Sequence, residues 1–63
     1  MIALFIVYDD NHDLESFSRK VEDTTRETLM GIVEDEGYRL SEIHDMYIID
    51  GELSHPGREY LED

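Results

Sequence analysis

An alternation of oxygen-bearing side chains near the start of the chain has the spacing of a ligand-binding motif. Asp9, Asn11 and Asp13 in YDDNHDLES are placed like the first three ligands of an EF-hand calcium loop. That loop also needs a glycine at its sixth position and a bidentate glutamate at its twelfth. Here those positions hold Leu14 and Lys20, and a lysine would repel the ion. The segment therefore predicts an acidic turn and not a calcium site.

Histidines offer little further chemistry, because the three are scattered and the chain has no cysteine to complete a zinc pattern. A metal site built from His12, Asp13 and the region of His55 stays open as an alternative to solvated turn residues. His44 and Asp45 suggest a catalytic triad, but adjacent strand residues point to opposite faces. No nucleophile elbow accompanies them. The sequence predicts a protein that is not an enzyme and uses no cofactor.

The chain combines a strong excess of negative charge with a composition that can fold. Seventeen Asp and Glu against five Lys and Arg give a net charge of −12, while 40% of the residues are hydrophobic. Such a surface repels nucleic acid and anionic membranes. We therefore predict a basic partner protein, no direct nucleic-acid binding and no membrane association. The apolar residues 2–8 are too few to span a membrane and lack a signal peptide's basic region, which predicts a cytoplasmic location.

The first third of the chain predicts a β-hairpin. Residues 2–8 carry apolar side chains on both alternating faces, which is typical of a central strand. The polar residues 9–15 form a turn, and residues 16–22 fit a second strand in which Phe17 and Val21 share a face. A helix that begins at Asp13 is the competing interpretation. We favour the hairpin.

A capped helix follows the hairpin. Thr24 and Glu27 in TTRE form a capping box, and Gly37 fits the left-handed position that ends a helix. Gly31 in the middle lowers helix stability by roughly 1 kcal/mol relative to alanine, and we expect close packing there. The helix has an apolar side and a charged side. The apolar side is formed by Leu29, Ile32 and Val33. The charged side is formed by Glu27, Glu34 and Asp35.

The last third predicts a third strand, residues 46–49, and a hairpin turn at Asp50-Gly51 with a short edge, residues 52–54. A right-handed crossover places the third strand beside the first and parallel to the second. The prediction is an α+β fold: a three- to four-stranded, mainly antiparallel sheet with one helix on one face (β-β-α-β). Residues 1–55 form the domain and residues 56–63 a flexible acidic tail.

A single helix covers one face of such a sheet, so the other face needs a partner. We predict an apolar patch there, formed by Phe5, Val7, Tyr47 and Ile49, because monomers seldom expose such surfaces. A small chain without disulfides often gains stability by association. The patch therefore predicts a homodimer or a partner surface, with more extensive coverage by the helix and tail as the alternative.

The carboxylates have spacings that suit imitation of DNA phosphates. Alternate strand residues are about 6.6 Å apart, Glu27 and Glu34 are about 10 Å apart along the helix, and duplex DNA carries one charge per roughly 1.7 Å. The residues predicted to bind a basic partner are Asp9, Asp10, Asp13, Glu15, Glu22, Asp23, Glu27, Glu34 and Asp35.

In its size, its strand start MIALFIVYDD, its capped helix TTRETLMGIVEDEG and its spread of acid, the chain resembles small acidic host-takeover proteins of bacteriophages. Within that class it is similar to DNA mimics that inhibit the bacterial nucleoid protein HU. The resemblance implies competition with DNA for a basic protein in the host bacterial cytoplasm, and it carries over no functional residue. Two alternatives stay open: a phage adaptor that binds RNA polymerase or a defence enzyme through the apolar patch, and a salt-adapted acidic domain.

Overall fold

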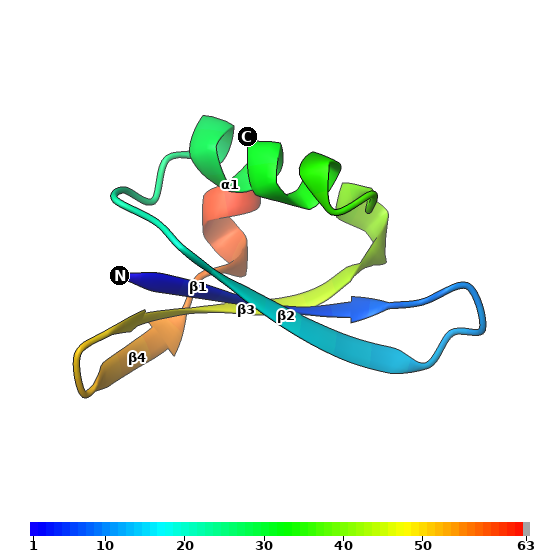
Figure 1. The fold of residues 1–63 in the computed structure, drawn as a ribbon, viewed down its shortest axis with the longest axis horizontal. Coiled ribbons are helices and arrows are strands. Elements are labelled where there is room, and N and C mark those ends of the chain that lie inside the picture. Colours follow the sequence, from blue (N-terminus) through cyan, green and yellow to red (C-terminus); the bar gives the residue numbers. More distant parts are fainter. Residues whose placement is uncertain (63) are drawn as a thin grey trace.

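A four-stranded antiparallel sheet forms one layer of the computed structural model, which describes residues 1–62 (Figure 1). The strands are β1 (Ile2–Tyr8), β2 (Leu14–Lys20), β3 (Ile43–Asp50) and β4 (Leu53–Pro56). Their order is β2-β1-β3-β4, and β1 runs antiparallel to both of its neighbours. The predicted α+β fold and the central position of the first strand are confirmed.

The second layer contains the helix α1 (Arg26–Asp35) and two short 3-10 helices, η1 (Leu40–Glu42) and η2 (Arg58–Leu61). All three lie on the same side of the sheet in Figure 1. Apolar side chains from both layers meet between them, and this core consists of Ala3, Phe5, Val7, Val21, Leu29, Val33, Ile43, Met46, Ile48 and Leu61. The helix layer therefore buries one face of the sheet and leaves the other uncovered.

The second strand is present, but it begins and ends two residues earlier than predicted. The turn needs fewer residues because the side chain of Asp9 organises it, so Leu14 already pairs with Tyr8. Phe17 faces the helix layer, as a strand requires, and its ring stacks on Phe5 with centroids 4.9 Å apart. The competing helical interpretation of this segment is wrong.

The start of α1 differs from the predicted capping box, whereas its end agrees with the prediction. Thr25, and not Thr24, is the N-cap: its side chain accepts a hydrogen bond from the Thr28 amide. Asp23 holds Thr25 in place by accepting hydrogen bonds from its amide and its hydroxyl group. At the other end Gly37 has a φ of 85°, the left-handed conformation expected of the residue that follows a helix.

The predicted apolar patch combined residues from opposite faces of the sheet. Phe5 and Val7 are fully buried against the helix layer. Tyr47 and Ile49 lie on the uncovered face, where they pair with Leu4 and Ile2. Both faces of β1 are apolar, so the sequence of that strand alone does not indicate which face meets the helix.

The domain also extends beyond the predicted boundary at residue 55. Leu61 in η2 is fully buried, and its carbonyl oxygen accepts a hydrogen bond from Arg26 Nε. Gly57 donates its amide to the carbonyl oxygen of Met46. The described part of the predicted tail is therefore packed on the sheet, while Asp63 lies outside the described residues.

Candidate protein-binding surfaces

The alternating acidic segment forms the turn between β1 and β2. Asp9 Oδ1 accepts hydrogen bonds from the amides of Asn11 at 2.8 Å and Asp13 at 2.9 Å. His12, at the tip of the turn, has a φ of 62°. The spacing that resembles a calcium loop is thus the spacing of a side-chain-supported turn. Asp9 is engaged with the backbone, whereas Asp10 and Asp13 are exposed.

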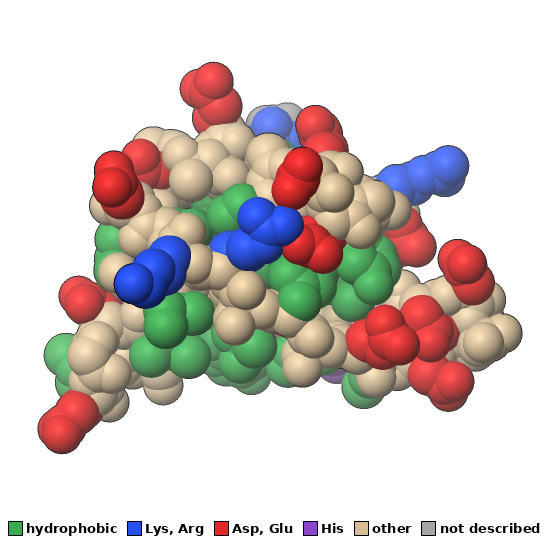
Figure 2. Space-filling model, in the orientation of Figure 1, with side chains coloured by type: hydrophobic (Ala, Val, Ile, Leu, Met, Phe, Trp, Pro, Cys, Tyr) green, Lys and Arg blue, Asp and Glu red, His purple; other side chains and the backbone are tan. Residues whose placement is uncertain are grey.

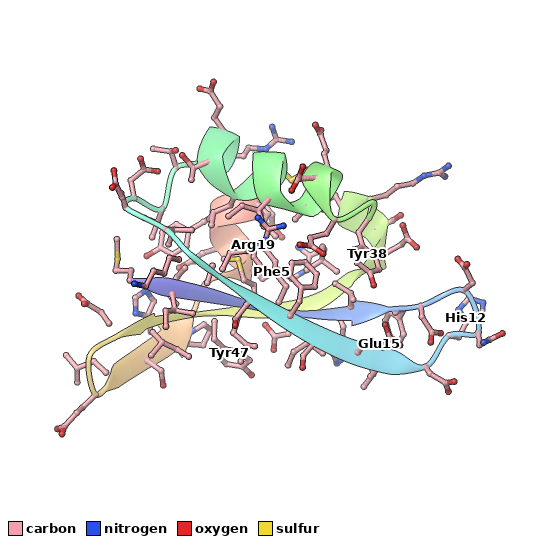
Figure 3. All side chains as sticks on the ribbon, viewed as in Figure 1. Phe5, His12, Glu15, Arg19, Tyr38 and Tyr47 are labelled. Carbon is pink, nitrogen blue, oxygen red and sulfur yellow. The ribbon has the colours of Figure 1, made fainter. Side chains whose placement is uncertain are left out.

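The residues of the alternative metal site are not brought together. Figure 3 shows His12 at one end of the sheet, and His55 belongs to β4, at the opposite end. The His55 ring instead contacts the hydroxyl group of Tyr60 at 3.2 Å. Within residues 1–62 no group of three or more His, Asp or Glu side chains is placed to hold a metal ion.

A second group of predicted binding residues surrounds the start of α1. Glu22, Asp23 and Glu27 are all exposed. Hydrogen bonds from the side chain of Thr28 and from the side chain and amide of Thr25 hold the pKa of Asp23 below its ordinary value of 3.8. Asp23 therefore stays charged in mildly acidic solution, with its orientation fixed by the helix cap.

A third group lies at the end of α1, where one arginine partly neutralises it. Arg19 of β2 contacts Asp35 at 3.1 Å and also binds Glu36 through two of its nitrogens. These two carboxylates, Glu36 foremost, raise the pKa of the arginine. Figure 3 shows Arg19 reaching from β2 toward the helix layer. Asp35 is therefore paired, while the neighbouring Glu34 side chain has no partner among residues 1–62.

The nine predicted residues thus form three groups and not one row of charge. Figure 2 shows acidic side chains around the viewed face, densest at the end that carries the β1–β2 turn, with basic side chains near its centre. Six of the nine predicted residues have side-chain carboxylates that make no hydrogen bond or ion pair with another described residue: Asp10, Asp13, Glu15, Glu22, Glu27 and Glu34. These are free to bind an external cation.

A different surface, predicted only in part from the sequence, covers the far side of the sheet. We call the face of the sheet turned away from α1 the open face. In Figure 2 the open face is seen from the side, as the lower edge of the molecule, and hydrophobic side chains extend along it. Its centre is made of Ile2, Leu4, Ile6, Tyr47 and Ile49, and its margins include Ser16, Ser18 and Ser54.

Charge is nearly absent from the open face. Among the described residues of its strands, Lys20 and Asp45 are the charged ones that it carries. The carboxylate of Asp45 is engaged: Oδ2 accepts from the Tyr47 hydroxyl at 3.0 Å and Oδ1 from the Met46 amide at 2.8 Å. The hydrogen bond to Asp45 raises the pKa of Tyr47. The signal that could have identified this face is the second apolar row of β1, at residues 2, 4 and 6.

One end of the open face is hollowed. An open depression of about 530 Å³ is lined by both apolar and charged side chains, including Ile2, Lys20 and Ile49. The depression is shallow and exposed to solvent, so it is not an enclosed ligand cavity. It belongs to the same surface as the apolar centre.

Comparisons of the chain with protein-family models, with curated proteins and with solved structures found no match. In the described part of the chain, the helices are too short and too polar to cross a membrane.

Proposed function

We propose that this protein is a non-enzymatic inhibitor that occupies the basic DNA-binding surface of another protein and thereby competes with DNA. The first candidate for that partner is the bacterial nucleoid protein HU. The observation that supports the proposal is the set of exposed side-chain carboxylates without a partner among residues 1–62, which includes Asp10 and Asp13 at the turn and Glu22 and Glu27 near the helix start.

The dimensions of the molecule suit this competition. Its Cα atoms extend over 33 × 22 × 18 Å, so the long axis is close to one turn of duplex DNA, about 34 Å. Carboxylates near both ends of that axis would meet basic side chains spaced to bind phosphates. The partner's lysines and arginines would exchange DNA phosphates for carboxylates of this protein, and no covalent bond would be made or broken.

A displacement titration tests the proposal. Labelled duplex is bound to purified HU, the protein is added, and anisotropy is recorded at low and moderate salt. We expect the duplex to be released stoichiometrically, with an apparent affinity that falls as salt rises, because charge–charge recognition is weakened by added ions. Circular dichroism of the protein in both buffers verifies that its fold is intact.

Two matched variants locate the binding surface. Asp10→Lys with Asp13→Lys changes the turn, and Glu52→Lys with Glu59→Lys produces the same change in net charge at exposed positions outside the predicted set. We expect the first variant to lose at least about tenfold in affinity and the second to lose much less. Equal losses would indicate a nonspecific effect of net charge, and no displacement by the unaltered protein would exclude HU.

A further inference from the structure

We propose that the open face is a self-association surface, on which two copies of this chain pack sheet against sheet around a twofold axis. The inference is independent of the proposed inhibition, because it depends on the apolar side of the molecule and not on its carboxylates. Its basis is the composition, the charge and the area of that face.

Charge distribution is the first reason to assign a second copy. The chain has a net charge of −12, yet the charges of Lys20 and Asp45 on the open face cancel each other. Two open faces can therefore meet without bringing like charges together at close range. The other described carboxylates are at the turns, on the helix layer or at strand positions on the side of α1, apart from Glu22, which lies at the edge of the open face and lines the depression there. A strongly basic partner would find no complementary charge on this face.

The arrangement of residue types is the second reason. Leu4, Ile6 and Tyr47 form part of an apolar centre, while Ser16 and Ser18 lie at the margin on β2. Protein interfaces usually have an uncharged, apolar centre that is surrounded by a polar rim. The Asp45 carboxylate is already satisfied by Tyr47 and by a backbone amide. Each of its two oxygens therefore keeps one hydrogen bond when the face is covered.

The area of the open face, once the relief of its side chains is added, is at the lower limit for a specific interface. Three strands of seven or eight residues and a fourth strand of four give a face of about 400 Å² on each copy before side-chain relief is added. A specific interface needs about 500 Å² on each copy. Two sheets pack about 10 Å apart with their strands roughly 30° from parallel. Such a dimer has helices outside and the two sheets in the middle, and its modest area predicts a weak, concentration-dependent association.

Sedimentation equilibrium at two salt concentrations tests the proposal. We expect the average mass to rise from the chain mass of 7.4 kDa toward twice that value with increasing concentration. We also expect added salt to strengthen association, because it screens repulsion between the two negative molecules. This salt response is opposite to that expected for displacement of DNA, so failure of one proposal is distinguishable from failure of the other.

Two variants with the same change of charge identify the face. Leu4→Lys alters the centre of the open face, whereas Leu53→Lys alters a side chain that is 76% exposed and points to the other side of the sheet. We expect Leu4→Lys to weaken association at least about tenfold and Leu53→Lys to leave it nearly unchanged. Urea unfolding of both variants at low concentration confirms that each is folded.

A second measurement does not depend on any variant. Amide chemical shifts of the unaltered protein are recorded on dilution, and we expect the changes to concentrate in β1 and β3. A monomer at all concentrations and at both salt concentrations would overturn the proposal. Association that Leu53→Lys disrupts as strongly as Leu4→Lys would also overturn it, since another surface would then be responsible.

Discussion

At the scale of single residues, several acidic side chains serve the fold before any partner is considered. Asp9 supports the turn and Asp23 orients the helix cap. Sequence spacing identified the turn but not the capping residue. Two adjacent threonines both fit a cap, and the hydrogen bonds that Thr25 donates to the Asp23 carboxylate decide between them. That choice depends on geometry which the sequence does not contain.

Gly31 provides a residue-scale prediction. Contrary to the expectation of close packing, a Cβ atom at this position would meet no atom of the described residues within 4 Å, apart from its chain neighbours and the backbone of its own helix. The residue lies inside α1, where alanine is favoured over glycine by about 1 kcal/mol. We expect Gly31→Ala to increase the free energy of unfolding by roughly 0.5–1 kcal/mol, as measured by urea denaturation.

Gly57 is the matched control for that substitution. A Cβ atom there would lie 2.7 Å from Met46 Cε and 3.0 Å from Ile48 Cγ1. We expect Gly57→Ala to destabilise the protein by roughly 1–3 kcal/mol, the usual effect of overpacking a core. If Gly57→Ala proved as favourable as Gly31→Ala, the close packing of η2 on β3 would be contradicted.

At the scale of elements, hydrophobic periodicity identified the strands and the helix, but it did not orient them. The alternation in β1 has two apolar rows, and the helix could cover either one. The answer comes from pairing with β3: Phe5 lies opposite the fully buried Met46, and Leu4 lies opposite Tyr47. Half of the predicted patch was therefore wrong, because register is a tertiary property.

The C-terminal segment was underestimated for a related reason. Its few apolar residues gave little periodic signal, yet Leu61 is fully buried beneath the helix. We expect Leu61→Ala to reduce the free energy of unfolding by about 2–5 kcal/mol. Glu59→Ala, in the same short helix but exposed, should change it by less than about 0.5 kcal/mol. Chemical denaturation compares the free energies of unfolding of the two variants directly. A similar stability for both would contradict packing of the C-terminal segment and support the flexible tail predicted from the sequence.

At the scale of the whole molecule, composition predicted the acidic surface but not its distribution. The net charge requires most carboxylates to be exposed, which is observed. The division into three groups depends on where the turn, the cap and the end of α1 lie. Their role in binding a basic protein stays a prediction. The near absence of charge from the open face depends on strand register, because the register brings alternate residues of neighbouring strands onto one surface.

The strand order also has a kinetic consequence. The two hairpins join neighbouring segments, whereas the central pair joins Ile2 to Ile49 across most of the chain. Closing such a long loop loses entropy before the contacts are gained, so pairing of β1 with β3 should limit the refolding rate.

We expect Ile48→Val, in the middle of β3, to slow refolding in stopped-flow experiments, while Leu61→Ala mainly accelerates unfolding. An unchanged refolding rate for Ile48→Val would place formation of the central pair after the rate-limiting step. A sheet assembled around such distant segments remains incomplete during synthesis until β3 has left the ribosome and can pair with β1.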